Sequence, residues 1–176
     1  MQARCVFVVT AVSLAIALAA TSAGAGETKP VQLALFSPAQ IFVPATTIHG
    51  VRLNLIYGVN KEVQGLDVGL VNRTTGYCKG LQTGLIGLTE GKFTGWQDNY
   101  VNIAKDFEGF QDGIYNGADT ARGFQWGFIN YTKSMRGLQL ALVNVTQKMH
   151  GLQIGLVNVI SDKKGLPVFP IVNWKF

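Results

Sequence analysis

Residues 137–158 read GLQLALVNVTQKMHGLQIGLVN, so the octet GLQ-x-x-LVN occurs twice, starting at Gly137 and again at Gly151. Variants of the same unit fill most of the chain, and its first glycine recurs at positions 50, 65, 80, 95, 109, 123, 137, 151 and 165. The spacing is 15 residues three times and then 14 residues five times. A fixed period of this kind indicates a repeat architecture and must be interpreted before any local motif.

Numbered from its glycine, the unit has the composition of a β-strand. Position 3 is mostly glutamine, position 5 is small or short, position 6 is large and apolar, position 7 is mostly β-branched, and position 8 is usually asparagine. Two glycines per unit and dense β-branched residues disfavour a helix. The alternation predicts a bulky face at positions 2, 4 and 6 and a small face at positions 1, 3, 5 and 7. We expect the small face to point inward, because restricted size at position 5 indicates a close neighbour.

Two all-β architectures fit one strand per unit. The favoured one is a small antiparallel β-barrel of about ten strands, with apolar residues facing lipid, polar residues facing inward and an aromatic last residue, Phe176. The alternative is a β-solenoid with one coil per repeat. The likeness of every unit to every other supports the solenoid, since successive turns of a barrel lie at opposite rims and should alternate. The bulky positions 2 and 6 argue against it, because a coil of 14 residues can barely enclose them.

The segment before the repeats has the pattern of an export signal. Residues 1–25 contain Arg4, an apolar run from residue 5 to residue 20, and the sequence Ala23-Gly24-Ala25 as a cleavage site. This pattern predicts a secretory signal peptide. The rest divides into an N-terminal strand and lead-in (26–49), eight repeats (50–164) and a C-terminal strand (165–176). The expected mature chain keeps a single cysteine, so it has no internal disulfide.

The overall composition excludes several classes of protein. Hydrophobic residues make up 48% of the chain and charged residues only 14%, which is the opposite of a disordered composition. The formal net charge is +5, but the lysines and arginines are scattered along the chain. Scattered basic residues are typical of solvated turns rather than of a nucleic-acid-binding stripe, so we expect no nucleic-acid partner.

The repeat also carries a family resemblance. The stretch LNLIYGVNKEVQGLDVGLVN (53–72), the GLQ-x-GLVN units and the ending FPIVNWKF (169–176) together resemble a family of exported bacterial repeat proteins. That family is widely predicted to be surface or outer-membrane associated and has no established biochemical activity. The resemblance implies an exported location and transfers no catalytic residue.

One short motif could carry chemistry. Residues 76–80, GYCKG, match G-x-C-x-G, a pattern similar to the nucleophile box of polyhydroxyalkanoate synthases. That chemistry needs a strand–turn–helix elbow with a histidine and an aspartate. The chain has only His49 and His150, and the strand repeat continues after Gly80. An acyltransferase-like enzyme using Cys78 is therefore a remote alternative, and we expect no catalysis. No motif indicates a metal or a cofactor.

The segment 96–128 combines aromatic and acidic residues. In-register stacking would place Trp96 near Phe110 and Asp98 near Asp112. Two adjacent carboxylates could share a cation, and aromatic neighbours could bind a sugar or a cationic group. A membrane girdle of aromatic residues is the plainer interpretation. The weak candidates for a binding site are Trp96, Asp98, Tyr100, Phe110, Asp112, Tyr115 and Trp126.

The sequence thus predicts an exported bacterial outer-membrane or surface repeat protein with a structural or interaction role. Its expected partners are outer-membrane lipid and a protein or glycan at the cell surface. The alternative is a soluble periplasmic or secreted solenoid that binds a ligand on the aromatic strip 96–128.

Overall fold

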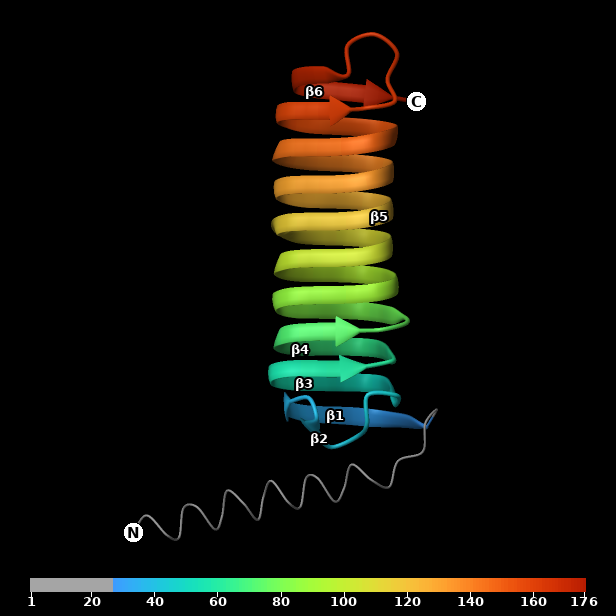
Figure 1. Ribbon diagram of the computed structural model, residues 1–176, viewed down its shortest axis with the longest axis vertical. Helices are drawn as coiled ribbons and strands as arrows, with labels where there is room; N and C mark the ends of the chain where they lie inside the picture. The colour runs from blue at the N-terminus through green and yellow to red at the C-terminus, as the bar shows by residue number, and fades with distance from the viewer. Residues whose placement is uncertain (1–26) are drawn as a thin grey trace, which may run out of the picture.

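The computed structural model describes residues 27–176, which are almost entirely β-strand and contain no helix. The strands are β1 (Thr28–Phe36), β2 (Ala39–Gln40), β3 (Thr47–Asn60), β4 (Glu62–Thr74), β5 (Cys78–Ile160) and β6 (Val168–Lys175) (Figure 1). The all-β prediction is confirmed. The expected signal peptide, residues 1–25, lies outside the described residues.

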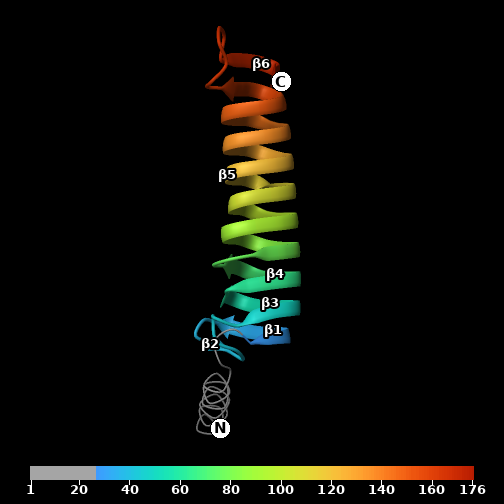
Figure 2. The ribbon, with the colours of Figure 1, turned by 90° about the vertical axis from the view of Figure 1, so that its right-hand side faces the viewer.

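The chain winds into a β-solenoid. Neighbouring strands β1, β3, β4 and β5 pair in parallel, and the first glycine of each repeat stacks on the next, as Gly50 on Gly65 and Gly65 on Gly80. The 83-residue β5 is one continuous strand that coils repeatedly on itself (Figure 1). The stack is broader in Figure 1 than in Figure 2, so each coil is flattened. The preferred expectation of an antiparallel barrel is therefore wrong, and the solenoid alternative is correct.

The first glycine of each repeat forms a sharp corner. Gly137, for example, has a backbone φ angle of 135°, which residues with a side chain rarely adopt. A Cβ atom at this position would lie only 2.0 Å from the carbonyl oxygen of Gly123. The corners of successive coils thus touch backbone to backbone. This contact explains why glycine recurs with the period of the coil.

A ladder of glutamine side chains runs through the interior. Each glutamine at position 3 donates its Nε2 to the Oε1 of the glutamine one coil nearer the N-terminus, over 2.7–2.9 Å. The ladder ends on Asp67, whose Oδ2 accepts from Gln82 over 2.8 Å. Arg52 neutralises this buried carboxylate, donating from Nε and Nη2 to its two oxygens over 2.7 Å each. The ladder contains Gln82, Gln97, Gln111, Gln125, Gln139 and Gln153.

A second ladder, of asparagines at position 8, runs in the opposite direction. Asn102, Asn116, Asn130 and Asn144 each donate Nδ2 to the Oδ1 of the asparagine one coil nearer the C-terminus, over 2.8–3.0 Å. The same Nδ2 groups also bond a backbone carbonyl at position 4 of the next coil. Buried amides need such partners. Hydrogen bonds between identical amide side chains of successive repeats form only when the repeats stack in parallel and in register, which favours the solenoid over an antiparallel barrel.

Between Asn72 and Asn158 the asparagine ladder is interrupted once. Gly87 occupies position 8, and the space beside it is filled by Asn99 from position 5 of the next coil. Asn99 donates its Nδ2 to the Oδ1 of Asn102 over 2.7 Å, which replaces the missing donor. The departures from the repeat at Gly87 and Asn99 therefore compensate each other.

A narrow apolar strip completes the core. It comes from the residue two places before each corner glycine, with small residues from position 10 packed against it. Phe93 and Phe107 stack here with ring centroids 5.9 Å apart, and Ala104 and Ala118 lie in the same cluster. The strip contains Ile48, Val63, Cys78, Phe93, Phe107, Ala121, Met135 and Met149.

The bulky positions 2, 4 and 6 point outward as expected, but the inward expectation for position 7 is wrong. Leu156 at position 6 and Val157 at position 7 are both exposed, at 67% and 41%. The chain turns a corner between them, which breaks the strict alternation. Because the bulky residues lie outside, the narrow coil does not have to enclose them, and the objection to a solenoid is removed.

Both ends of the stack are covered by short pieces of chain. At the C-terminal end β6 runs antiparallel to the last coil and pairs Trp174 with Leu152. Asn173 anchors it, donating Nδ2 to the carbonyls of Asn158 and Pro167 over 3.2 and 3.1 Å. At the other end β2 pairs with β1.

Candidate functional site

The most distinctive surface feature is a groove of about 440 Å³ on the face formed by positions 1–6. Asp98 and Asp112 lie next to each other in its floor, because both occupy position 4 of successive coils, and Trp126 follows them in the same row. Its walls include Tyr100 and Phe128 from position 6. We call this feature the acidic groove, and its lining is completed by Thr83, Gly84, Leu85, Asn99, Gly113, Ile114 and Gly127.

The ionisation of Asp112 is affected by its surroundings in the groove. The pKa of Asp112 is raised above its ordinary value, first because partial burial removes water from the carboxylate and second because of the negative charge of Asp98. Within residues 27–176, no lysine or arginine forms an ion pair with either group. The groove is therefore a site of unbalanced negative charge between aromatic walls.

An aromatic column runs along position 2 beside the groove. The ring centroids of Trp96 and Phe110 are 5.7 Å apart, and those of Phe110 and Phe124 are 5.2 Å apart. Phe124 in turn meets Trp126 edge-on at 6.1 Å. The column connects the groove floor at Trp126 to the exposed indole of Trp96.

The structure gathers four of the seven candidate residues into the groove and leaves three outside it. Asp98, Tyr100, Asp112 and Trp126 line the groove. Trp96 and Phe110 belong to the neighbouring aromatic column. Tyr115 is separated from them, because position 7 lies beyond the corner of the coil, where it lines a different hollow with Gly117 and Tyr131.

Sequence reasoning missed Thr83, Leu85 and Ile114 as groove residues. Thr83 precedes Asp98 in the row of position 4, and Leu85 and Ile114 flank Tyr100 in the row of position 6. Reading each position across successive repeats would have found them.

Cys78 is a residue of the apolar strip and lies between Val63 and Phe93 along the stack. Burial, followed by the charge of nearby Asp67, raises the pKa of its thiol to about 12. A protonated thiol turned into the core is not an activated nucleophile. Gly76 of the motif G-x-C-x-G lies in a bend, strand β5 begins at Cys78 and continues through Gly80, and the motif forms no strand–turn–helix elbow.

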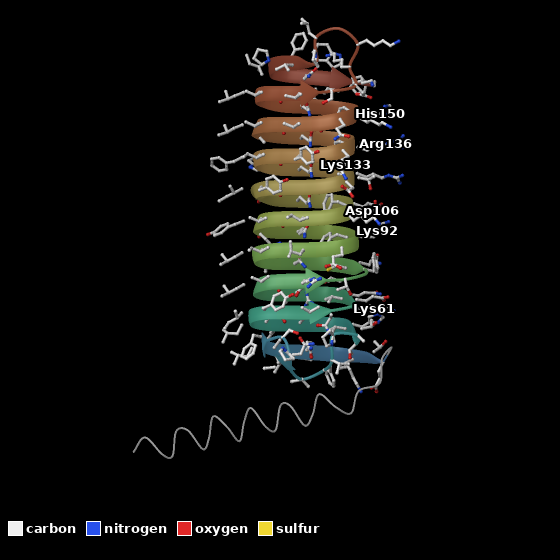
Figure 3. The ribbon with its side chains drawn as sticks, in the orientation of Figure 1. Lys61, Lys92, Asp106, Lys133, Arg136 and His150 are labelled. Carbon is white, nitrogen blue, oxygen red and sulfur yellow. The ribbon has the colours of Figure 1, made fainter. Side chains whose placement is uncertain are left out.

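Charged residues gather along one narrow edge of the solenoid, which we call the charged edge, at positions 11 to 14. Figure 3 shows this edge through its labelled side chains, which are Lys61, Lys92, Asp106, Lys133, Arg136 and His150. Ion pairs link successive coils there, including Lys92 with Glu108 and Lys133 with Asp119, each over 2.7 Å. The hydrogen bond from Lys92 lowers the pKa of Glu108. Lys61, Lys105 and Arg136 form none of the ion pairs found in residues 27–176, so the edge keeps uncompensated positive charge.

Residues 27–176 contain no helix long and apolar enough to cross a membrane. Within the same part of the chain, no three histidine, cysteine, aspartate or glutamate side chains come together as metal ligands would. Comparisons with protein-family models, curated proteins and solved structures found no match. The resemblance to exported repeat proteins therefore stays a prediction.

Proposed function

We propose that the chain is an exported bacterial surface or outer-membrane protein that acts as an interaction scaffold, without a catalytic step. One observation supports this most strongly. The solenoid buries polar amides and exposes large apolar side chains in long rows, including Leu55, Leu70, Leu142 and Leu156. A contiguous apolar surface of this extent is typical of an interaction site.

The ordered rows also suit a scaffold. Each position of the repeat presents its side chain about 4.8 Å from the equivalent one in the next coil, since this is the spacing of paired strands. The core ladders fix this spacing along β5. A rigid surface with regularly spaced contacts loses little freedom on binding, which favours association.

Cell fractionation tests this proposal. Membranes of the producing cell are washed first with buffer and then with high salt, and the protein is followed in each fraction. We expect the protein to remain with the membranes through the salt wash, because salt screens charge contacts and leaves apolar ones. Recovery of the whole population in the buffer wash would refute an envelope-bound scaffold.

The acidic groove favours a second candidate function, the binding of a small cation or sugar on the outer face. Asp98 and Asp112 provide negative charge, and Trp126 and Tyr100 provide exposed aromatic rings. An organic ammonium group is attracted by both. Titration with tetramethylammonium, followed by tryptophan fluorescence, tests this function.

Matched variants decide the assignment of that site. Asp98→Asn with Asp112→Asn should weaken ammonium binding, because both changes remove charge from the groove. Asp106→Asn, on the charged edge, serves as the control and should leave binding unchanged. Equal affinity of all three proteins would reject the groove as the binding site.

A further inference from the structure

One narrow edge of the solenoid is apolar along its whole length. It consists of the side chains at position 6, which are all large and apolar and are 41–67% exposed. The row contains no charged residue, and we call it the apolar ridge. Its members are Leu55, Leu70, Leu85, Tyr100, Ile114, Phe128, Leu142 and Leu156.

Apolar side chains at position 7 broaden the ridge on one side, and apolar side chains of β1 and β6 extend it at its two ends. Ile56 and Ile129 at position 7 are exposed beside it. At the C-terminal end Ile171 of β6, which is 71% exposed, shares an apolar hollow with Leu142 and Leu156. At the N-terminal end Leu35 of β1 is exposed between residues that pair with the first coil. The charged edge gathers a different set of positions, 11 to 14 (Figure 3).

The shape of the ridge argues against a second copy of the chain as its partner. One apolar side chain of this size offers about 60–120 Å² of apolar area when fully exposed. Eight half-exposed residues then offer about 240–480 Å² of apolar area, whereas a stable dimer buries about 800 Å² on each partner, of which about 450 Å² is apolar. Two convex ridges would meet along a line, so the area actually buried would be smaller still.

A lipid layer does not have this limitation, since acyl chains can surround a convex edge and cover its flanks as well. Amphipathic surface elements enter such a layer to a depth of about 5–10 Å. Position 4 lies two residues from the ridge, or about 6.6 Å along the strand. At that depth Asp98 and Asp112 would lie among polar headgroups, and Tyr100 and Trp126 would lie where aromatic residues are enriched.

We propose that the apolar ridge inserts into one leaflet of a lipid membrane, with the long axis of the solenoid parallel to the membrane plane. This inference rests on the proposed function, in which the outward apolar surface is the interacting surface. The charged edge then faces water. Because the ridge carries no charge, its binding depends on acyl chains and not on anionic headgroups.

Vesicle flotation tests the inference. The purified protein is mixed with neutral phosphatidylcholine vesicles at low and at high salt, and the floated fraction is measured. We expect flotation that is insensitive to salt. The ridge variant, Leu70→Ser with Leu142→Ser and Leu156→Ser, should bind at least about tenfold more weakly because it loses exposed apolar area.

A matched control removes three exposed apolar residues outside the ridge, by Leu66→Ser with Ile103→Ser and Val168→Ser. This control should float within about twofold of the unmodified protein, since its ridge is intact. Circular dichroism of both variants checks that the solenoid is still folded. Equal flotation of the ridge variant and the control would overturn the assignment of the ridge.

Other outcomes point to other partners. Flotation only with anionic vesicles, and only at low salt, would overturn the inference and assign binding to the charged edge. A dimer in sedimentation that the ridge variant abolishes, without flotation, would replace lipid by a second copy. Fractionation separates the two proposals: if the ridge variant stays with washed cell membranes like the unmodified protein, only the ridge inference fails. If the unmodified protein leaves in the buffer wash, the proposed function fails too.

Discussion

Exchanging the two irregular residues of the polar core, by Gly87→Asn together with Asn99→Gly, should leave the solenoid about as stable as before. Each change alone should destabilise it. A Cβ at Gly87 would lie 2.2 Å from Gln82 Oε1 and 2.4 Å from Asn99 Nδ2, so an asparagine there is overpacked. Overpacking of a core costs about 1–3 kcal/mol of unfolding free energy.

The second single variant fails for a different reason. Asn99→Gly removes the amide group Nδ2 of Asn99, which donates to Asn102 Oδ1 over 2.7 Å, and leaves this buried oxygen without a hydrogen-bond donor. An unsatisfied buried acceptor costs about 1–3 kcal/mol. The added freedom of glycine in the unfolded chain contributes about 0.5–1 kcal/mol more.

The double variant removes both causes at once. Asn99→Gly removes the contact with Asn99 Nδ2, and the contact with Gln82 Oε1 is relieved by a shift of that flexible side chain, because the regular coils hold glutamine at position 3 together with asparagine at position 8. The asparagine at position 87 can then accept from Asn72 and donate to Asn102 as the regular asparagines do. It also eliminates Asn99 Oδ1, which is buried without a hydrogen-bond partner. The coupling free energy between the two positions should therefore be about 2–6 kcal/mol in favour of the double variant, the sum of the overpacking and unsatisfied-acceptor penalties.

Urea denaturation of the four proteins in this double-mutant cycle measures the coupling. Repeat proteins can unfold in parts, so coincidence of fluorescence and circular dichroism transitions must be checked first. If the double variant is destabilised by the sum of the two single effects, the compensation between Gly87 and Asn99 does not exist.

Three further perturbations test other parts of the structure. Arg52→Met should lower the free energy of unfolding, measured by urea denaturation, by about 3–5 kcal/mol, because Asp67 stays buried without its counterion. Adding Asp67→Gln should recover most of this loss, because the new glutamine extends the glutamine ladder. If stability is not recovered, the ladder does not have the stabilising role described. The pKa of Asp112 is raised on folding, so its charge opposes folding above that pKa and not below the ordinary value of 3.8. Asp112→Asn should therefore gain at most a few tenths of a kcal/mol at pH 7 and nothing at pH 3, and an equal gain at both pH values would contradict this. Deletion of residues 166–176 should expose the hydrogen-bonding edge of the last coil and cause concentration-dependent association in light scattering, whereas a monomer would show that β6 does not protect this edge.

The sequence predicted the strands and the outward bulky rows, because both follow from local residue size and shape. It did not decide between barrel and solenoid, since either one places large residues outside and small ones inside. The deciding information was the recurrence of glutamine at position 3 and asparagine at position 8. Identical amides satisfy one another only when coils stack in parallel, as Gln111 does on Gln97 over 2.8 Å. The corner after position 6 was not predictable from alternation, which is why Tyr115 was grouped with residues on another face.

The composition of the core shows that the solenoid does not need the apolar ridge in order to fold. A coil of 14 residues encloses glutamine, asparagine, threonine and one apolar strip, and these groups satisfy the interior by themselves. Nothing in the core requires a leucine at Leu70 or Leu156, since both side chains point to solvent. Exposed leucine lowers solubility, and a strand tolerates threonine or lysine at such a site. Folding of the core therefore does not account for the large apolar residues at position 6 in every coil, and this supports the proposal that the apolar ridge is a contact surface.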